Sequence, residues 1–153
     1  MLDIDRFGLF VTSITQIYRH MQKIKQLEMT EFGLRGSHVM CVYNLSRHKN
    51  GLTPTELCTL CEEDKGAVSR TLSELKKLGY INYTPIIFGE KKYRQKITLT
   101  EEGKKTACSV NEKINIALAD GGAGLSENER ENFYVSLKKI AENLQAICDN
   151  AVI

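Results

Sequence analysis

Apolar residues recur every three or four positions near the start of the chain and predict a helix over residues 4 to 27. A helix of this length spans about 35 Å, which is long for a small domain. We therefore expect part of it to pack outside the core of its own lobe. A second helix is predicted at 37 to 47. The stripe on the first helix consists of Phe7, Phe10, Val11, Ile14, Ile17, Tyr18, Met21 and Ile24.

A helix-turn-helix is predicted next, from two short helices joined by the turn Glu62-Glu63-Asp64. Thr53 and Glu56 have the spacing of a capping box, and Pro54 occupies the first turn, so a helix is expected at 54 to 61. Asp64 caps the following helix. That helix covers 65 to 78 and stops at Gly79, because glycine readily adopts the left-handed backbone conformation that ends many helices.

A two-stranded hairpin with a basic tip is predicted after Gly79, from strands at 80 to 87 and 93 to 99 and a turn at 88 to 91. Pro85 is tolerable only at an edge or bulge of such a strand. Thr100 caps a helix at 101 to 119. Ser126 and Glu129 form another capping box, and the last helix is expected to end near residue 149.

The predicted fold class is therefore mainly α: a winged helix-turn-helix with a two-stranded β wing, framed by N- and C-terminal helices. The chain has 153 residues, of which 42% are hydrophobic and 26% charged, as expected of one globular domain. It has no run of apolar residues long enough for a membrane span and no secretory signal. Five cysteines without dense pairing suggest a reducing compartment, so we expect a cytoplasmic protein with no membrane partner.

Basic residues outnumber acidic residues most clearly in the middle of the chain. The net charge is only +2, but residues 64 to 98 hold eight Lys or Arg against three Asp or Glu. This distribution suits a surface that faces phosphates. By itself it is also compatible with an ordinary solvated face.

The helix at 65 to 78 separates two faces. An apolar stripe consists of Val68, Leu72, Leu75 and Leu78. The opposite face carries small residues around Arg70, which suits a helix that enters the DNA major groove and reads bases with a bidentate donor. Lys65 lies near the helix start and suits a phosphate. The opposite face comprises Gly66, Arg70, Ser73 and Lys77, with Lys65 and Ser69 beside the first turn.

These motifs resemble the MarR family of bacterial transcriptional regulators over nearly the whole chain. The resemblance is carried by Leu52-Thr53-Pro54-Thr55-Glu56-Leu57, Asp64-Lys65-Gly66-Ala67-Val68-Ser69-Arg70-Thr71-Leu72, Leu75-Lys76-Lys77-Leu78-Gly79-Tyr80-Ile81 and Ile97-Thr98-Leu99-Thr100-Glu101-Glu102-Gly103.

The resemblance implies one MarR-like domain at 1 to 153 that forms an obligate homodimer. Residues 33 to 100 would form the DNA-binding lobe, and 1 to 30 and 101 to 153 the dimerisation helices. Each recognition helix would enter a major groove, and each wing the adjacent minor groove. The DNA-binding residues would be Thr53, Thr55, Lys65, Gly66, Ser69, Arg70, Ser73, Lys77, Lys91, Lys92 and Arg94.

The sequence departs from the family pattern at two places. The family often carries Asp-x-Arg in the wing, with the Arg in the minor groove. Here the tip reads Glu90-Lys91-Lys92-Tyr93-Arg94, so the role falls to Arg94 or to Lys92. Glu62 replaces the glycine of many helix-turn-helix turns, and because positive φ is uncommon for such a residue we expect a turn of different construction.

The family also implies an effector pocket between the dimer frame and the DNA-binding lobe. Such a pocket would need an aromatic wall and cations for a small ligand, often an anionic aromatic compound. For each candidate residue, a structural role on the surface or in the core, with no ligand, is an alternative of at least equal weight. The candidates are Arg19, His20, Arg35, His38 and Tyr43.

Cys58-x-x-Cys61 does not have the partners of a zinc finger, and packing is favoured over redox sensing for both residues. No arrangement of nucleophile, base and acid points to an enzyme, and no metal or cofactor is expected.

The leading hypothesis is a homodimeric, sequence-specific DNA-binding regulator that binds a pseudo-palindromic operator, a repressor released by a small-molecule effector. One alternative is a cysteine-based redox-responsive regulator on the same fold. The other is a dimeric protein-interaction module that no longer binds DNA.

Overall fold

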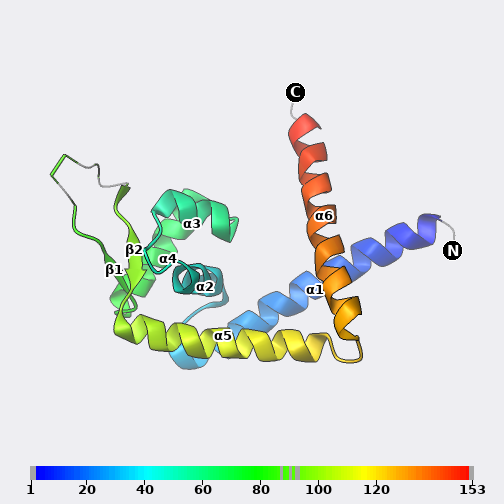
Figure 1. Cartoon of the computed structure of the whole chain (residues 1–153), viewed down its shortest axis with the longest axis horizontal. Coiled ribbons are helices and arrows are strands. Elements are labelled where there is room, and N and C mark those ends of the chain that lie inside the picture. The colour runs from blue at the N-terminus through cyan, green and yellow to red at the C-terminus, as the bar shows by residue number, and fades with distance from the viewer. Residues whose placement is uncertain (1–2, 87, 90, 92–93, 152–153) are drawn as a thin grey trace. The chain divides into compact units, whose positions relative to one another are not determined.

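The computed structural model describes residues 3–86, 88–89, 91 and 94–151. The chain forms two compact units, Met1–Asn115 and Ile116–Ile153. Described helices and strands follow in the order expected of a winged helix-turn-helix (Figure 1). They are α1 (Asp3–Met29), α2 (Val39–Arg47), α3 (Pro54–Cys61), α4 (Lys65–Lys77), β1 (Ile81–Tyr83), β2 (Ile97–Leu99), α5 (Glu101–Gly121) and α6 (Glu127–Ala151). Two short 3-10 helices, η1 (Thr30–Phe32) and η2 (Gly36–His38), lie between α1 and α2. The predicted fold class is confirmed.

Local capping signals set the ends of α3 and α4 as the sequence predicts. The Glu56 N–H donates to Thr53 Oγ1 at 3.3 Å, and the Thr53 N–H donates to Glu56 Oε2 at 2.7 Å. The Ala67 N–H donates to Asp64 Oδ1 at 2.7 Å. Gly79 follows α4 with φ 76°, the left-handed conformation that ends many helices.

The strands of the wing are shorter than predicted. β1 and β2 pair antiparallel only from Ile81 opposite Leu99 to Tyr83 opposite Ile97. One more ladder bond, from the Thr84 N–H to the Lys96 carbonyl, has a length of 2.8 Å. Pro85 comes next and has no N–H to donate, so regular pairing ends there. The remainder of the predicted hairpin includes positions 87, 90, 92 and 93, which lie outside the described residues.

The hydrophobic core lies where α2, α3, α4, the wing strands and the start of α5 meet. The side chains of Leu57, Leu75, Ile81 and Ile97 are almost completely buried there. A short two-stranded sheet is marginal by itself, so this packing is what holds the wing in place. Leu52 adds a bridge, since its N–H and carbonyl pair with those of Ile97 at 3.0 and 2.8 Å.

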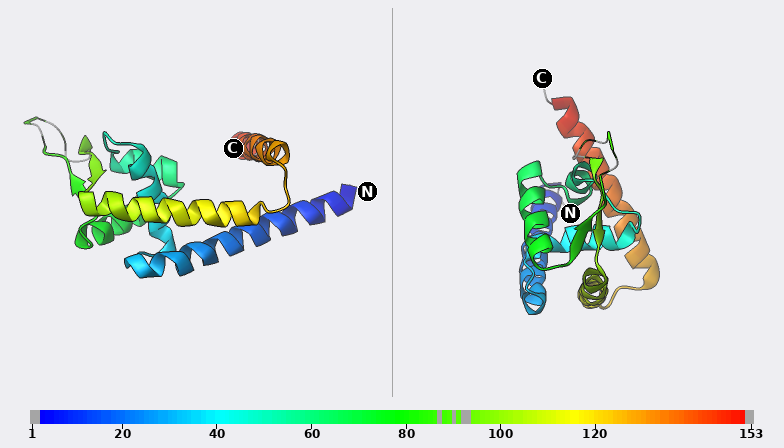
Figure 2. Two further views of the ribbon diagram at one scale, coloured as in Figure 1. Left: turned by 60° about the horizontal axis from the view of Figure 1, so that its bottom comes forward. Right: turned by 90° about the vertical axis from the view of Figure 1, so that its left-hand side faces the viewer.

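The first part of α5 runs beside the end of α1 (Figure 2). Lys113 Nζ lies 2.9 Å from a carboxylate oxygen of Glu28 and 2.6 Å from one of Glu31. Glu28 lies in the last turn of α1 and Glu31 lies just after that helix, so Lys113 joins α5 to the end of α1. These hydrogen bonds raise the pKa of Lys113, Glu31 contributing most.

The second unit contains the end of α5 and α6. The predicted capping box is present, since the Ser126 N–H donates to Glu129 Oε2 at 2.8 Å. Arg130 Nη2 donates to the Gly122 carbonyl at 3.2 Å and ties α6 to the preceding loop. No described side chain of α6 is buried. No described helix has the length and apolar character needed to cross a membrane.

Candidate nucleic-acid interface

The two faces of α4 have the environments that its sequence predicts. Val68, Leu72 and Leu75 are buried, together with Thr71. Leu78 differs from the prediction because it lies just past the end of α4 and is 39% exposed. The predicted DNA-facing residues are all exposed, and they are Lys65, Gly66, Ser69, Arg70, Ser73 and Lys77.

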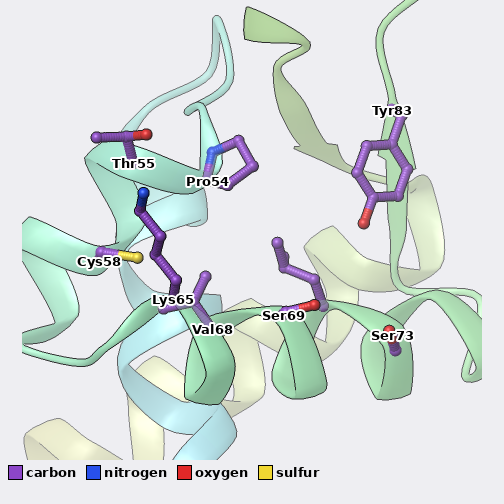
Figure 3. Close-up of a pocket in the computed structure, with 9 residues that line it drawn as sticks. Pro54, Thr55, Cys58, Lys65, Val68, Ser69, Ser73 and Tyr83 are labelled. Atoms are coloured by element: carbon purple, nitrogen blue, oxygen red, sulfur yellow. The ribbon is translucent and has the colours of Figure 1, made fainter. Parts of the chain in front are cut away.

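A groove of about 610 Å³ lies over part of this exposed face, bounded by α3, α4 and β1 (Figure 3). The Lys65 side chain extends from α4 toward Thr55, and the Tyr83 ring faces the groove from β1. The groove is lined by Pro54, Thr55, Cys58, Lys65, Val68, Ser69, Leu72, Ser73 and Tyr83.

Tyr83 is a groove residue to which the sequence pattern does not point, because its position depends on how β1 packs against α4. Partial burial raises the pKa of Tyr83, so its hydroxyl keeps its proton and can donate a hydrogen bond. Lys76 Nζ lies 6.0 Å from the centre of the Tyr83 ring. The groove therefore combines an ammonium group, hydroxyl groups and an aromatic ring.

Arg70 lies against the first turn of α4. A Cβ added to Gly66 would approach Arg70 Nη1 to 3.4 Å and Asp64 Oδ1 to 3.2 Å. A side chain at this position would therefore press on the Asp64 cap and meet the Arg70 guanidinium at ordinary contact distance.

The two threonines predicted to bind DNA differ in whether the side chain is engaged in a helix cap or exposed in the groove. The Thr53 hydroxyl donates to Glu56 Oε2 at 2.9 Å and accepts the Glu56 N–H, so it is engaged as a helix cap. The hydrogen bonds from the Thr53 N–H and hydroxyl lower the pKa of Glu56. Thr55 is exposed in the groove.

In the wing, Lys91 and Arg94 are both exposed. The Arg94 N–H donates to the Lys91 carbonyl at 2.9 Å. Lys92, the other candidate for the minor groove, lies outside the described residues. The choice between Arg94 and Lys92 stays a prediction.

The expectation of an unusual turn between α3 and α4 is wrong. Glu62 has φ 54° and ψ 42°, the left-handed conformation that glycine adopts easily. The Glu63 N–H donates to the Cys58 carbonyl at 3.1 Å, which is the bond of a Schellman motif. The turn therefore has the usual construction, with a glutamate at the strained position.

Arg35 and His38, two of the predicted effector residues, meet at Glu74 of α4. Arg35 Nη2 lies 3.1 Å from Glu74 Oε1, and His38 Nε2 lies 2.5 Å from Glu74 Oε2. The Arg35 N–H donates to His38 Nδ1 at 3.0 Å, so Nε2 carries the histidine proton. Arg19 and His20 are exposed on α1, and Tyr43 is half-buried on α2. The structure therefore brings two of the five together.

Among the described residues, no group of three or more His, Cys, Asp or Glu side chains is placed to hold a metal ion. Cys58 and Cys61 are both half-buried and both free, as is the buried Cys41.

Residues 32–85 match the model of the MarR family. Several solved structures have the same fold over nearly the whole chain. One MarR family transcription regulator is 17% identical with a TM-score of 0.83, and the match covers 97% of each chain. A MarR transcriptional regulator from Methanosarcina mazei Go1 is 20% identical with a TM-score of 0.80, over 92% of this chain and 99% of that one.

A third similar structure is a MepR–DNA complex from S. aureus, 20% identical with a TM-score of 0.73, over 86% of this chain and 93% of that one. No curated protein gives a significant sequence match. The predicted resemblance to the MarR family is confirmed, for the lobe by the family model and for the fold by the solved structures.

Proposed function

We propose, on the premise that this chain has the lobe and the fold of the MarR family, that it is a homodimeric, sequence-specific DNA-binding transcriptional regulator. The observation that carries the proposal is the outer face of α4. Small residues there surround Arg70, and Lys65 lies at the helix start, while the opposite face is buried. The solved MepR–DNA complex with the same fold supports DNA as the partner.

In this proposal different residues of the surface contact the bases and the phosphates. Arg70 donates to a base in the major groove, where small Ser69 and Ser73 let the helix backbone approach. Lys65 and Lys77, with the exposed Thr55, contact phosphates and position the helix. The Tyr83 hydroxyl adds a donor from β1. Lys91 and Arg94 extend the basic surface along the wing.

The homodimer is supported by the apolar face of α1. Ile17 and Tyr18 are 50% and 66% exposed, and they continue the stripe that begins at Phe7. A contiguous apolar stripe of this length is costly in water and indicates a protein contact. The helix α6 carries a further exposed apolar stripe through Phe133, Ile140, Leu144 and Ile147. We assign residues 1 to 30 and 101 to 153 to dimerisation and 33 to 100 to DNA binding.

Repression and effector release complete the proposal. A dimer places two copies of α4 about one helical turn apart, which suits a pseudo-palindromic site. A small anionic aromatic ligand that prefers a dimer with differently spaced recognition helices lowers DNA affinity by its differential affinity for that state. Such a protein acts from the cytoplasm and performs no catalysis.

Selection of bound duplexes from a random pool tests the proposal, because it reports the preferred sequence and the half-site spacing together. On the selected duplex, we expect Arg70→Ala to weaken binding by about 1–3 kcal/mol and to relax one base position. Lys65→Ala should weaken binding to all duplexes evenly and lower the salt dependence. Lys105→Ala removes an exposed lysine of α5 and serves as the matched control.

A protein-interaction module without DNA binding predicts the opposite result. In that case the chain shows no salt-dependent affinity for any duplex in the pool. Enrichment of paired half-sites that survives Arg70→Ala unchanged would instead remove Arg70 from the base-reading role.

A further inference from the structure

The wing beyond β1 presents apolar side chains to solvent. The Phe88 side chain is fully exposed, at 106%, and Ile86 is 50% exposed. Gly89 follows with φ 89°, the left-handed conformation that favours glycine. We call Ile86, Phe88 and Gly89 the apolar tip. It presents an aromatic ring that packs against no described part of the chain.

The base of the apolar tip is held in place by Thr84. The Thr84 N–H donates to the Lys96 carbonyl at 2.8 Å, and the Lys96 N–H donates to Thr84 Oγ1 at 3.1 Å. The side-chain amide of Gln95 donates to the Thr84 carbonyl. Pro85 comes next, and its ring fixes one backbone torsion of the outgoing segment. This support lowers the conformational entropy that the apolar tip loses when it binds a partner.

β1 connects the apolar tip to the exposed face of α4. It packs against α4, and the Tyr83 ring faces the groove over that face (Figure 3). Beyond Tyr83 the chain runs outward from the helices (Figure 1). Phe88 follows Tyr83 by five positions, which span at most about 17 Å. Half a turn of DNA is also about 17 Å. Phe88 can therefore reach the groove next to the one that α4 occupies.

The charge that follows the apolar tip suits a duplex. The five residues after Gly89 include three cations and one acid, and Lys91 and Arg94 are exposed. Apolar side chains next to cations are what proteins insert between base pairs from the minor groove. A membrane surface also accepts this composition. The neighbouring face of α4, however, presents Arg70 among small polar residues and no further apolar anchor, which favours DNA.

We propose that Phe88 is a wedge that enters the minor groove beside α4 and partly separates two stacked base pairs. This inference rests on the proposed function. An inserted apolar ring unstacks one base step and bends the duplex toward the major groove. A pyrimidine followed by a purine unstacks most easily, so the wedge selects sequence through deformability and not through a hydrogen bond. The protein therefore prefers such a step about five base pairs from the base that Arg70 reads.

The first experiment measures affinity and bending on the duplex obtained from the random-pool selection. Anisotropy reports the affinity, and energy transfer between dyes at the two duplex ends reports the bend. Phe88→Ala should bind at least about fivefold more weakly and lose most of the bend. Phe88→Leu should keep the bend, because leucine also serves as a wedge.

The salt dependence of binding separates the wedge from a phosphate contact. Phe88→Ala should keep the salt dependence of the wild type because it loses no cation, whereas Lys91→Ala should lower it. The melting temperature of Phe88→Ala should equal that of the wild type, since the side chain is fully exposed. Equal affinity and equal bending of Phe88→Ala and the wild type would overturn the proposal.

The second experiment repeats the random-pool selection with Phe88→Ala. We expect paired half-sites with the base read by Arg70, but no preferred pyrimidine–purine step. Retention of that step would remove the wedge and leave the proposed function standing. If the wild type binds no duplex, both fall. Binding to phosphatidylglycerol vesicles that requires Phe88, with DNA binding unaffected by Phe88→Ala, would overturn the wedge and assign the apolar tip to a membrane.

Discussion

Glu62 occupies a backbone conformation that side chains other than glycine rarely adopt, with φ 54°. The left-handed region brings Cβ close to the following carbonyl oxygen and costs about 1–2 kcal/mol. The strain persists because the capped helices α3 and α4 on either side determine the turn. Glu62 lies directly after Cys61, the last residue of α3, so a strained residue begins the turn between α3 and α4.

Replacing this residue with glycine should stabilise the protein. For Glu62→Gly we expect a rise in the free energy of unfolding of about 0.5–1 kcal/mol, since relief of strain exceeds the added flexibility of the unfolded chain. Glu63→Gly should lower the free energy of unfolding, because only the flexibility changes there. Urea unfolding of the three proteins measures both. A lower midpoint for Glu62→Gly would contradict the strain argument.

Gly103 is needed for a different reason, the close approach of α5 to the chain before β1. An added Cβ would lie 2.0 Å from the Tyr80 carbonyl oxygen, which is impossible without displacing α5. We expect Gly103→Ala to lower the free energy of unfolding by about 1–3 kcal/mol. Gly121→Ala is the control, since nothing lies within 4 Å of its added Cβ, and its effect should stay within about 0.5 kcal/mol. Thermal and urea unfolding distinguish the two variants.

At the scale of elements, the contact of His38 and Arg35 with Glu74 fixes α4 against the segment before α2. His38 is almost completely buried, and both of its ring nitrogens are hydrogen-bonded. The position of α4 therefore depends on a carboxylate as well as on its leucines. The hydrogen bond from His38, with the nearby Arg35 guanidinium, lowers the pKa of Glu74.

The lowered pKa makes a pH dependence testable. A group whose pKa is lower in the folded state stabilises the protein above its unfolded pKa, and this contribution is lost as the pH falls through the folded value. Glu74→Gln should therefore lower the melting temperature near neutral pH, and its difference from the wild type should shrink below about pH 4.5. Melting curves over a series of pH values measure this.

Glu101→Gln is the matched control for that series. Its hydrogen bond with Lys104 also lowers the pKa of Glu101, but both side chains are well exposed, so the pair contributes little to stability. We expect a much smaller effect than for Glu74→Gln at every pH. Equal effects of the two substitutions would show that the Glu74 contact does not fix α4.

At the scale of the whole molecule, the apolar face of α1 decides whether two copies can present two α4 helices. Ile17→Glu adds a charge to this face and should convert the proposed dimer into monomers, because a buried unpaired carboxylate is costly. Gln16→Glu adds the same charge to the opposite face of α1 and should leave the dimer intact. Sedimentation velocity measures the assembly.

Loss of the dimer should also weaken DNA binding strongly, since only one half-site contact remains. Anisotropy measurements with the selected duplex check this. An Ile17→Glu protein that still sediments as a dimer would place the dimer contact elsewhere.

The elements that sequence analysis predicted correctly depend on signals within a few residues of each other. The spacing of Thr53 with Glu56, the cap at Asp64 and Gly79 after α4 locate α3 and α4 closely. The helical period also predicted α1 at 4 to 27, and the structure has Asp3–Met29. Local hydrogen bonds and helical periodicity depend only on neighbouring residues, and they also indicated which face of α4 is exposed.

Contacts between distant segments were decided only by the tertiary structure. The packing of α2 against α3 places Cys41 and Cys61 at the same small cavity, and the packing of α4 brings Glu74 to His38. Tyr83 joins the groove because β1 packs against α4. Glu62 adopts a conformation against its own preference because the helices around it are held in place. In each case the energy comes from burial and long-range hydrogen bonds, which no local pattern in the chain encodes.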